Sequence, residues 1–125
     1  MKAPHILIVD DEPNIVMSLE FLMRKNGYEV GIARNGTEAL AAIAATAYDL
    51  VLLDVMMPDV DGLHVCRQLR QHPAHFHTKV IFLSAKSKDA DVAAGYAAGA
   101  DLYVPKPFST RTLMAQVRAL LGVAV

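Results

Sequence analysis

Short, uninterrupted apolar runs alternate along this chain with longer stretches in which apolar residues recur every three or four positions. The runs at residues 6–9 and 50–53 are typical of strands buried on both faces of a sheet. The longer stretches predict amphipathic helices that each lay one apolar side on that sheet. Strands are expected at residues 5–9, 28–33, 50–53, 79–83 and 101–104. This alternation predicts an α/β fold, a five-stranded doubly wound parallel sheet with five helices, in which residues 28–33 are polar enough for an edge strand.

Local signals predict where the helices begin and end. Pro13 suits the first turn of the first helix, and Gly27 suits a left-handed cap after its last turn. The pair His72-Pro73 is expected to end the third helix. The residues expected to start or cap three other helices are Asn35 or Gly36, Asp61, and Ser109 or Thr110.

The sequence also predicts how two of the helices pack. The fourth, at about residues 88–98, is short, rich in alanine and interrupted by Gly95, so we expect it to be the least firmly packed. For the second, the residues expected on the buried face are Ala39, Leu40, Ile43 and Ala44.

Polar residues that suit a cation site follow the predicted strands. Asp10 and Asp11 follow the first strand and Asp54 follows the third, so three carboxylates would meet at one edge if these strands are parallel neighbours. Like charges held that close invite a divalent metal ion. Ser84 ends the fourth strand and Lys106 follows the fifth, at the same edge. Ligands of such sheets bind at the carboxyl ends of the strands, so this edge is the candidate site.

Composition and charge narrow the class of protein. The 125 residues are 54% hydrophobic, but no apolar run approaches the roughly 20 residues that cross a bilayer, and the start of the chain has no signal-peptide core. A cytoplasmic protein without a membrane partner is expected. Lys and Arg number 12 against 13 Asp and Glu, with no basic run, so direct nucleic-acid binding is not expected. The single cysteine, Cys66, cannot form an internal disulfide and suits a buried helix position.

Four segments together resemble a known family. They cover residues 8–13, residues 49–62 with the sequence Asp-Val-Met-Met-Pro-Asp-Val-Asp-Gly from Asp54, residues 83–85 and residues 99–108. On these motifs the chain resembles the receiver domain of bacterial two-component response regulators, the CheY-like fold. The resemblance implies one receiver domain over residues 1–125, with the flavodoxin-like strand order 2-1-3-4-5.

The resemblance also implies a metal-dependent phosphoryl acceptor. Asp54 would take a phosphoryl group from a histidine kinase or a histidine phosphotransfer protein, its carboxylate attacking phosphorus. Asp11, with Asp10 partly through water, would hold Mg²⁺ beside Asp54, and the backbone carbonyl of Met56 would be a further ligand. Carboxylates and phosphate oxygens suit Mg²⁺.

The same resemblance implies a switch. Lys106, with a cis bond to Pro107, would neutralise charge on the phosphoryl oxygens, and Ser84 would donate its hydroxyl to them. Movement of Ser84 would leave room for Tyr103 to turn inward, which would change the surface of the fourth helix, fifth strand and fifth helix. That surface would contact an output domain or a partner protein, and it could also join two copies in a homodimer.

Two other classes of function stay open. A phosphatase or phosphotransferase with an aspartyl intermediate is disfavoured because Met56 stands where a second Asp would act as an acid, so we expect no enzyme beyond its own phosphorylation and dephosphorylation. A receiver-like protein-binding module that signals without phosphorylation is disfavoured because all five pocket groups are present. The chain ends at Val125 without an output domain, which suits either a complete single-domain regulator or a receiver taken from a longer protein.

The candidate residues also have plainer interpretations. Asp10 and Asp11 could simply favour the start of a helix, and Lys106 could be an ordinary surface lysine in a turn. The histidines at positions 72, 75 and 77 could suggest a metal site, but their loop lies at the edge opposite the acidic pocket. We therefore expect them to be surface residues without a metal.

Overall fold

Five parallel strands and five helices alternate in the part of the chain that the structure, a computed structural model, describes, which is residues 3–122. The strands form one sheet in the order β2-β1-β3-β4-β5, which confirms the predicted order and fold class. A short 3₁₀ helix, Pro73–His75, precedes β4. In chain order the other elements are β1 His5–Val9, α1 Pro13–Lys25, β2 Glu29–Ala33, α2 Gly36–Ala45, β3 Leu50–Leu53, α3 Gly62–Gln71, β4 Lys79–Ser84, α4 Asp89–Ala97, β5 Leu102–Pro105 and α5 Thr110–Leu121.

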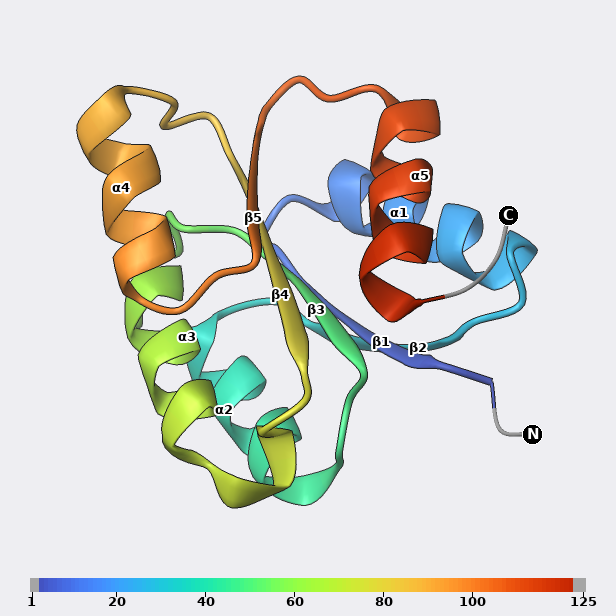
Figure 1. Ribbon diagram of the computed structural model, residues 1–125, viewed down its shortest axis with the longest axis horizontal. Helices are drawn as coiled ribbons and strands as arrows, with labels where there is room; N and C mark the ends of the chain where they lie inside the picture. The colour runs from blue at the N-terminus through green and yellow to red at the C-terminus, as the bar shows by residue number, and fades with distance from the viewer. Residues whose placement is uncertain (1–2, 123–125) are drawn as a thin grey trace.

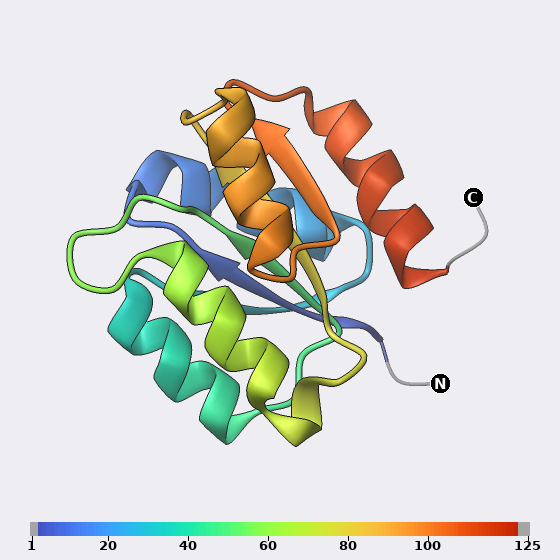
Figure 2. The same ribbon diagram turned by 60° about the vertical axis from the view of Figure 1, so that its left-hand side comes forward.

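Helices cover both faces of the sheet. Helices α1 and α5 lie on one face, and α2, α3 and α4 lie on the other (Figure 1). Turned by 60°, the molecule shows α2 and α3 side by side beneath the sheet (Figure 2). Because side chains alternate along a strand, Ile6 and Ile8 point to the first face and Leu7 and Val9 to the second. Each face therefore has its own apolar core.

Most of the predicted helix limits are confirmed. Asn35, Asp61 and Ser109 each accept a hydrogen bond from the backbone amide three residues on, as N-caps do. Gly27 follows α1 with φ +88°, a left-handed conformation that favours glycine. Cys66 is fully buried on α3, as expected.

Some strand limits and one buried position differ from the prediction. Strand β2 begins at Glu29 rather than at Tyr28, and β5 ends at Pro105 rather than at Val104. Strand β5 begins at Leu102 rather than at Asp101, because the Asp101 carboxylate turns back to accept the Val80 amide and to pair with Arg70, both at 2.8 Å. On α2, Ala44 is exposed instead of buried, because the apolar side that meets the core runs through Ala39 and Ile43.

Helix α4 packs closely on β5 at Gly95, which has no side chain. Gly95 is buried, and a Cβ built on it would lie 2.6 Å from Cδ2 of Tyr103. The glycine that interrupts the helical pattern thus leaves room for an aromatic ring of the next strand. Its cost in helix propensity is offset by this close contact.

The prediction of surface histidines is wrong for His75, which is fully buried. Its Nε2 donates to the carbonyl oxygen of Ile43 at 2.7 Å, and its Nδ1 lies 3.0 Å from Oγ1 of Thr78. The Thr78 hydroxyl in turn donates to the Tyr48 carbonyl at 2.6 Å. A polar ring can be buried here because both of its nitrogens have partners, which join the end of α2 to the segment before β4.

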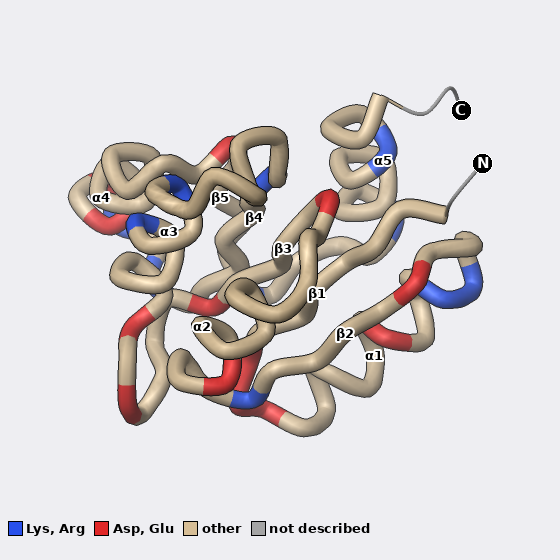
Figure 3. The backbone as a smooth tube through the Cα atoms, turned by 90° about the horizontal axis from the view of Figure 1, so that it is seen from below, with Lys and Arg blue, Asp and Glu red and all other residues tan. Residues whose placement is uncertain are grey.

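Charged residues of both signs are scattered over the described chain, and no basic face stands out in the view from below (Figure 3). Within residues 3–122, no helix is both long and apolar enough to cross a membrane.

The buried hydroxyl of Thr78 predicts a stability effect. Thr78→Val should lower the free energy of unfolding by about 1–3 kcal/mol, because the Tyr48 carbonyl loses its donor inside the protein. Urea unfolding followed by circular dichroism measures the change. Thr112→Val is the matched control at an exposed position and should change stability by less than about 0.5 kcal/mol. Equal stability of the two variants would contradict the prediction.

Candidate functional site

Three charged side chains meet at the carboxyl edge of the sheet. Strands β1 and β3 pair in parallel with Val9 opposite Leu53, so the residues that follow them, Asp10 and Asp54, emerge side by side. Both carboxylates are almost fully buried. Lys106 comes from the far end of β5, and its long side chain reaches back so that Nζ lies 2.9 Å from Asp10 Oδ2 and 3.5 Å from Asp54 Oδ2. The Lys106-Pro107 bond is cis, as predicted.

Burial and the charge of the Lys106 ammonium together determine how the pKa values at this site shift. Burial raises the pKa of the Asp54 carboxyl, the Lys106 charge opposes that rise, and the neighbouring Asp10 adds to it. Burial by itself lowers the pKa of Lys106, but the hydrogen bond to Asp10 and the nearby carboxylates outweigh it and raise the pKa. Lys106 therefore stays charged and offsets part of the cost of two buried carboxylates.

Four carboxylates gather closely enough to share a cation. Asp10, Asp11, Glu12 and Asp54 can each offer one oxygen such that all four oxygens lie within 4.8 Å of one another. Asp10 and Asp54 lie at the buried side of the cluster, and Asp11 and Glu12 at the exposed side. An all-oxygen set that is open to solvent on one side fits Mg²⁺, which keeps some of its waters.

Glu12 is a member of this cluster that sequence reasoning did not assign to the site. Its Oε1 lies 3.3 Å from Lys106 Nζ. The available signal was its place directly after Asp10 and Asp11, but acidic residues at the start of a helix have a sufficient explanation without a ligand.

Ser84 and Tyr103 meet at the loop that follows β4. The buried Ser84 Oγ accepts the amide of Lys86 at 3.1 Å, and the Tyr103 hydroxyl donates to the carbonyl of the same residue. The Tyr103 ring is only 7% exposed, so it lies in the inward position that we expected it to reach only after a shift of Ser84. Lys86 is thus the backbone link between these two side chains.

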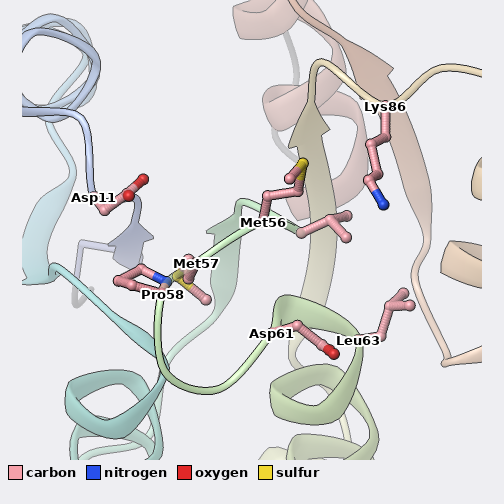
Figure 4. A pocket seen from close by; sticks show the side chains of 8 residues that line it. Asp11, Met56, Met57, Pro58, Asp61, Leu63 and Lys86 are labelled. Atoms are coloured by element: carbon pink, nitrogen blue, oxygen red, sulfur yellow. The ribbon is translucent and has the colours of Figure 1, made fainter.

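A pocket of about 480 Å³ opens beside the acidic cluster. Asp11 and Lys86 lie on opposite sides of it with Met56 between them (Figure 4). The Met56 amide donates to Asp54 Oδ1 at 3.2 Å, which places the backbone of this loop against the buried carboxylate. Of the four clustered carboxylates, Asp11 is the one that lines this pocket.

All the sequence-predicted residues therefore lie at one edge of the sheet. Lys106 contacts both Asp10 and Asp54, Asp11 belongs to the acidic cluster, and the Met56 amide contacts Asp54. The remaining two, Ser84 at the end of β4 and Tyr103 on β5, reach the β4–α4 loop with their side-chain oxygens.

Comparison with known proteins agrees with this geometry. A family model described as the response regulator receiver domain matches residues 6–118. The chain is 45% identical to the transcriptional regulatory protein ResD of Bacillus subtilis (strain 168), over 93% of this chain and 47% of that protein. It is 44% identical to the alkaline phosphatase synthesis transcriptional regulatory protein PhoP of the same organism, over 93% of this chain and 48% of that protein. The chain thus spans about half the length of these curated relatives.

Solved structures give the same result. A CheY-like response regulator receiver domain protein from Methanospirillum hungatei JF-1 superposes with a TM-score of 0.91 at 30% identity, over 97% of this chain and 95% of that one. The receiver domain of a sensor histidine kinase from Pseudomonas aeruginosa PAO1 superposes with a TM-score of 0.88 at 27% identity, over 97% and 99% of the two chains. That structure has a magnesium ion coordinated in its active-site cleft.

Asp54→Asn should raise the free energy of unfolding at pH 7 in metal-free buffer. Burial raises the pKa of the Asp54 carboxyl in the folded chain, so ionisation costs stability as the pH rises through the interval between the unfolded and folded pKa values. A neutral amide avoids that cost. The gain should shrink toward pH 4, near the ordinary pKa of Asp, because more of the wild-type carboxyl is protonated there than at pH 7.

Urea unfolding at the two pH values measures the difference. Glu29→Gln, at an exposed position on the edge strand β2, is the control and should leave stability within about 0.5 kcal/mol of wild type at pH 7. A loss of stability in Asp54→Asn at pH 7, or a gain of equal size at both pH values, would refute this account of the buried charge.

Proposed function

Because this chain belongs to the family of response regulator receiver domains, we propose that it accepts a phosphoryl group on Asp54 in two-component signalling. The donor is a histidine kinase or a histidine phosphotransfer protein. The chain acts as a signalling domain that catalyses only its own phosphorylation and dephosphorylation.

The observation that carries the proposal is the reach of Lys106 across the sheet edge. Its ammonium contacts both buried carboxylates, Asp10 and Asp54, although β5 is separated from β3 by β4. A lysine that served only solubility would extend into solvent rather than lie with its side chain only 12% exposed. Its position suits a cation that neutralises charge brought to Asp54.

Transfer to Asp54 uses groups already aimed at the site. A carboxylate oxygen of Asp54 attacks phosphorus and forms an O–P bond, while the donor's bond to phosphorus breaks and its electron pair leaves with the donor. Lys106 lies within reach of the added phosphoryl oxygens. The Ser84 hydroxyl is the nearby donor that can follow them.

Receiver domains typically bind Mg²⁺ at this acidic pocket, and the acidic cluster supports the same cation here. Asp11 and Asp54, with Asp10 partly through water and the backbone carbonyl of Met56, are the proposed ligands. The ion supplies positive charge for the phosphoryl oxygens when it is bound.

The proposed output is the surface of α4, β5 and α5. Ser84 and Tyr103 both hold Lys86, so a shift of Ser84 toward a phosphoryl group moves the loop to which the Tyr103 hydroxyl is bonded. The Tyr103 ring packs on Gly95 of α4, which connects the loop to the helix. An output domain or a partner protein would recognise this surface, which could also join two copies in a homodimer.

Incubation with Mg²⁺ and acetyl phosphate should add the mass of one phosphoryl group to the intact chain. Asp54→Asn and a chelator should each abolish the gain, and Lys106→Ala should slow it about a hundredfold because a preorganised charge is lost. Lys25→Ala, at an exposed position on α1, is the matched lysine control and should react as wild type. No gain of mass in wild type would favour a receiver-like binding module that signals without phosphorylation.

Phosphorylation should also shift backbone amide NMR signals in α4, β5 and α5. Tyr103→Phe should reduce the shifts in α4 without preventing phosphorylation, because it removes the hydroxyl that holds Lys86. Tyr48→Phe removes another buried tyrosine hydroxyl and should leave the shifts unchanged. Shifts confined to the residues around Asp54 would contradict the proposed output surface.

A further inference from the structure

The loop between β3 and α3 carries Met56 past the acidic cluster with little support from its own backbone. At its base, the Gly62 amide donates to the Val55 carbonyl at 2.8 Å. Within the described part of the chain, residues 56–60 take part in no backbone–backbone hydrogen bond. The course of this loop therefore depends on side chains.

Asp59 makes three of these side-chain contacts. Its carboxylate accepts the backbone amides of Gly36 and Thr37, each at 2.9 Å, and also the Thr37 hydroxyl. These amides open α2, where the helix dipole favours a negative charge. The hydrogen bond from the Thr37 hydroxyl, followed by those from the backbone, holds the pKa of Asp59 below its usual range, so the carboxylate is charged at neutral pH.

The start of α2 has its own cap besides Asp59. The side chain of Asn35 accepts the Glu38 amide at 2.8 Å. The beginning of α2 is therefore already stabilised by an N-cap close to it in the sequence. The contribution that Asp59 adds is a link between this helix and a loop 22 residues further along the chain.

A second contact fixes the same loop independently. A Cβ built on Gly36 would lie 2.2 Å from the carbonyl oxygen of Val60. The backbone of α2 and the backbone of the loop thus touch at a place where only glycine fits. The hydrogen bonds to the Asp59 carboxylate, which tether the loop to α2, and this steric contact hold one position of the loop.

We propose that Asp59 is a positioning residue that holds the β3–α3 loop against α2 and so sets the Met56 backbone for Mg²⁺. The inference rests on the proposed function, because the metal site is part of it. The Met56 amide lies 3.2 Å from Asp54 Oδ1, three residues before the tether. Without the tether the loop samples more positions, and the apparent affinity falls by the fraction of time spent in the competent one.

Calorimetric titration of the 125-residue chain with Mg²⁺ alone tests this. Asp59→Ala should weaken the affinity about fivefold, as a competent loop population of about one fifth would give. Gly36→Ala displaces the loop without changing any charge and should weaken the affinity to a similar extent. Asn35→Ala is the matched control, because it removes a cap of the same helix but leaves the loop contacts intact, and its affinity should match wild type.

Acetyl phosphate kinetics separate positioning from chemistry. In Asp59→Ala, the Mg²⁺ concentration that gives half the maximal rate should rise about fivefold, while the rate at saturating Mg²⁺ stays within about twofold of wild type. Circular dichroism checks that each variant is folded. A general loss of stability would instead affect Asn35→Ala and Asp59→Ala alike.

The outcomes distinguish this inference from the function on which it rests. If wild type binds Mg²⁺ and the affinities of Asp59→Ala and Gly36→Ala are unchanged, the positioning role is overturned and the proposed function stands. If only Asp59→Ala weakens binding, its negative charge explains the effect and the positioning role is overturned. If wild type does not bind Mg²⁺, the metal-dependent function fails together with this inference.

Discussion

The site depends on the ion pairs that the Lys106 ammonium makes with Asp10 and Asp54. Two carboxylates, Asp10 and Asp54, are buried next to each other, an arrangement in which burial and mutual repulsion both oppose ionisation. One buried cation offsets part of that repulsion, and it comes from the last strand of the sheet. The ion pairs of Lys106 therefore connect the end of β5 to the ends of β1 and β3, which the register of these two strands places side by side.

Parallel pairing explains why so much chemistry collects there. Every strand presents its carboxyl end to the same edge, so residues that follow different strands meet there although they are far apart in the sequence. Register then decides which of them meet most closely. Val9 lies opposite Leu53, so the acids that follow these two residues are direct neighbours.

Loops connect this edge to the helices on one face of the sheet. The β4–α4 loop is held at Lys86 by Ser84 and Tyr103, and the Tyr103 ring lies against Gly95 of α4. The β3–α3 loop is held on α2 through Asp59. Both loops border the acidic pocket, and each is tied to a different helix.

The sequence by itself determined the strands, the helix caps and the strand-end residues Asp10, Asp54 and Lys106, because periodicity and capping are local and because parallel strands order their ends. It did not determine the burial of His75, the exposure of Ala44 or the contact of Gly95 with Tyr103. Each of these depends on atoms distant along the chain: the Ile43 carbonyl, the rotation of α2 over the core, and a ring from the next strand. The tether from Asp59 to α2 belongs to the same class, since a carboxylate in a turn has the same sequence pattern whether it meets water or the start of a helix.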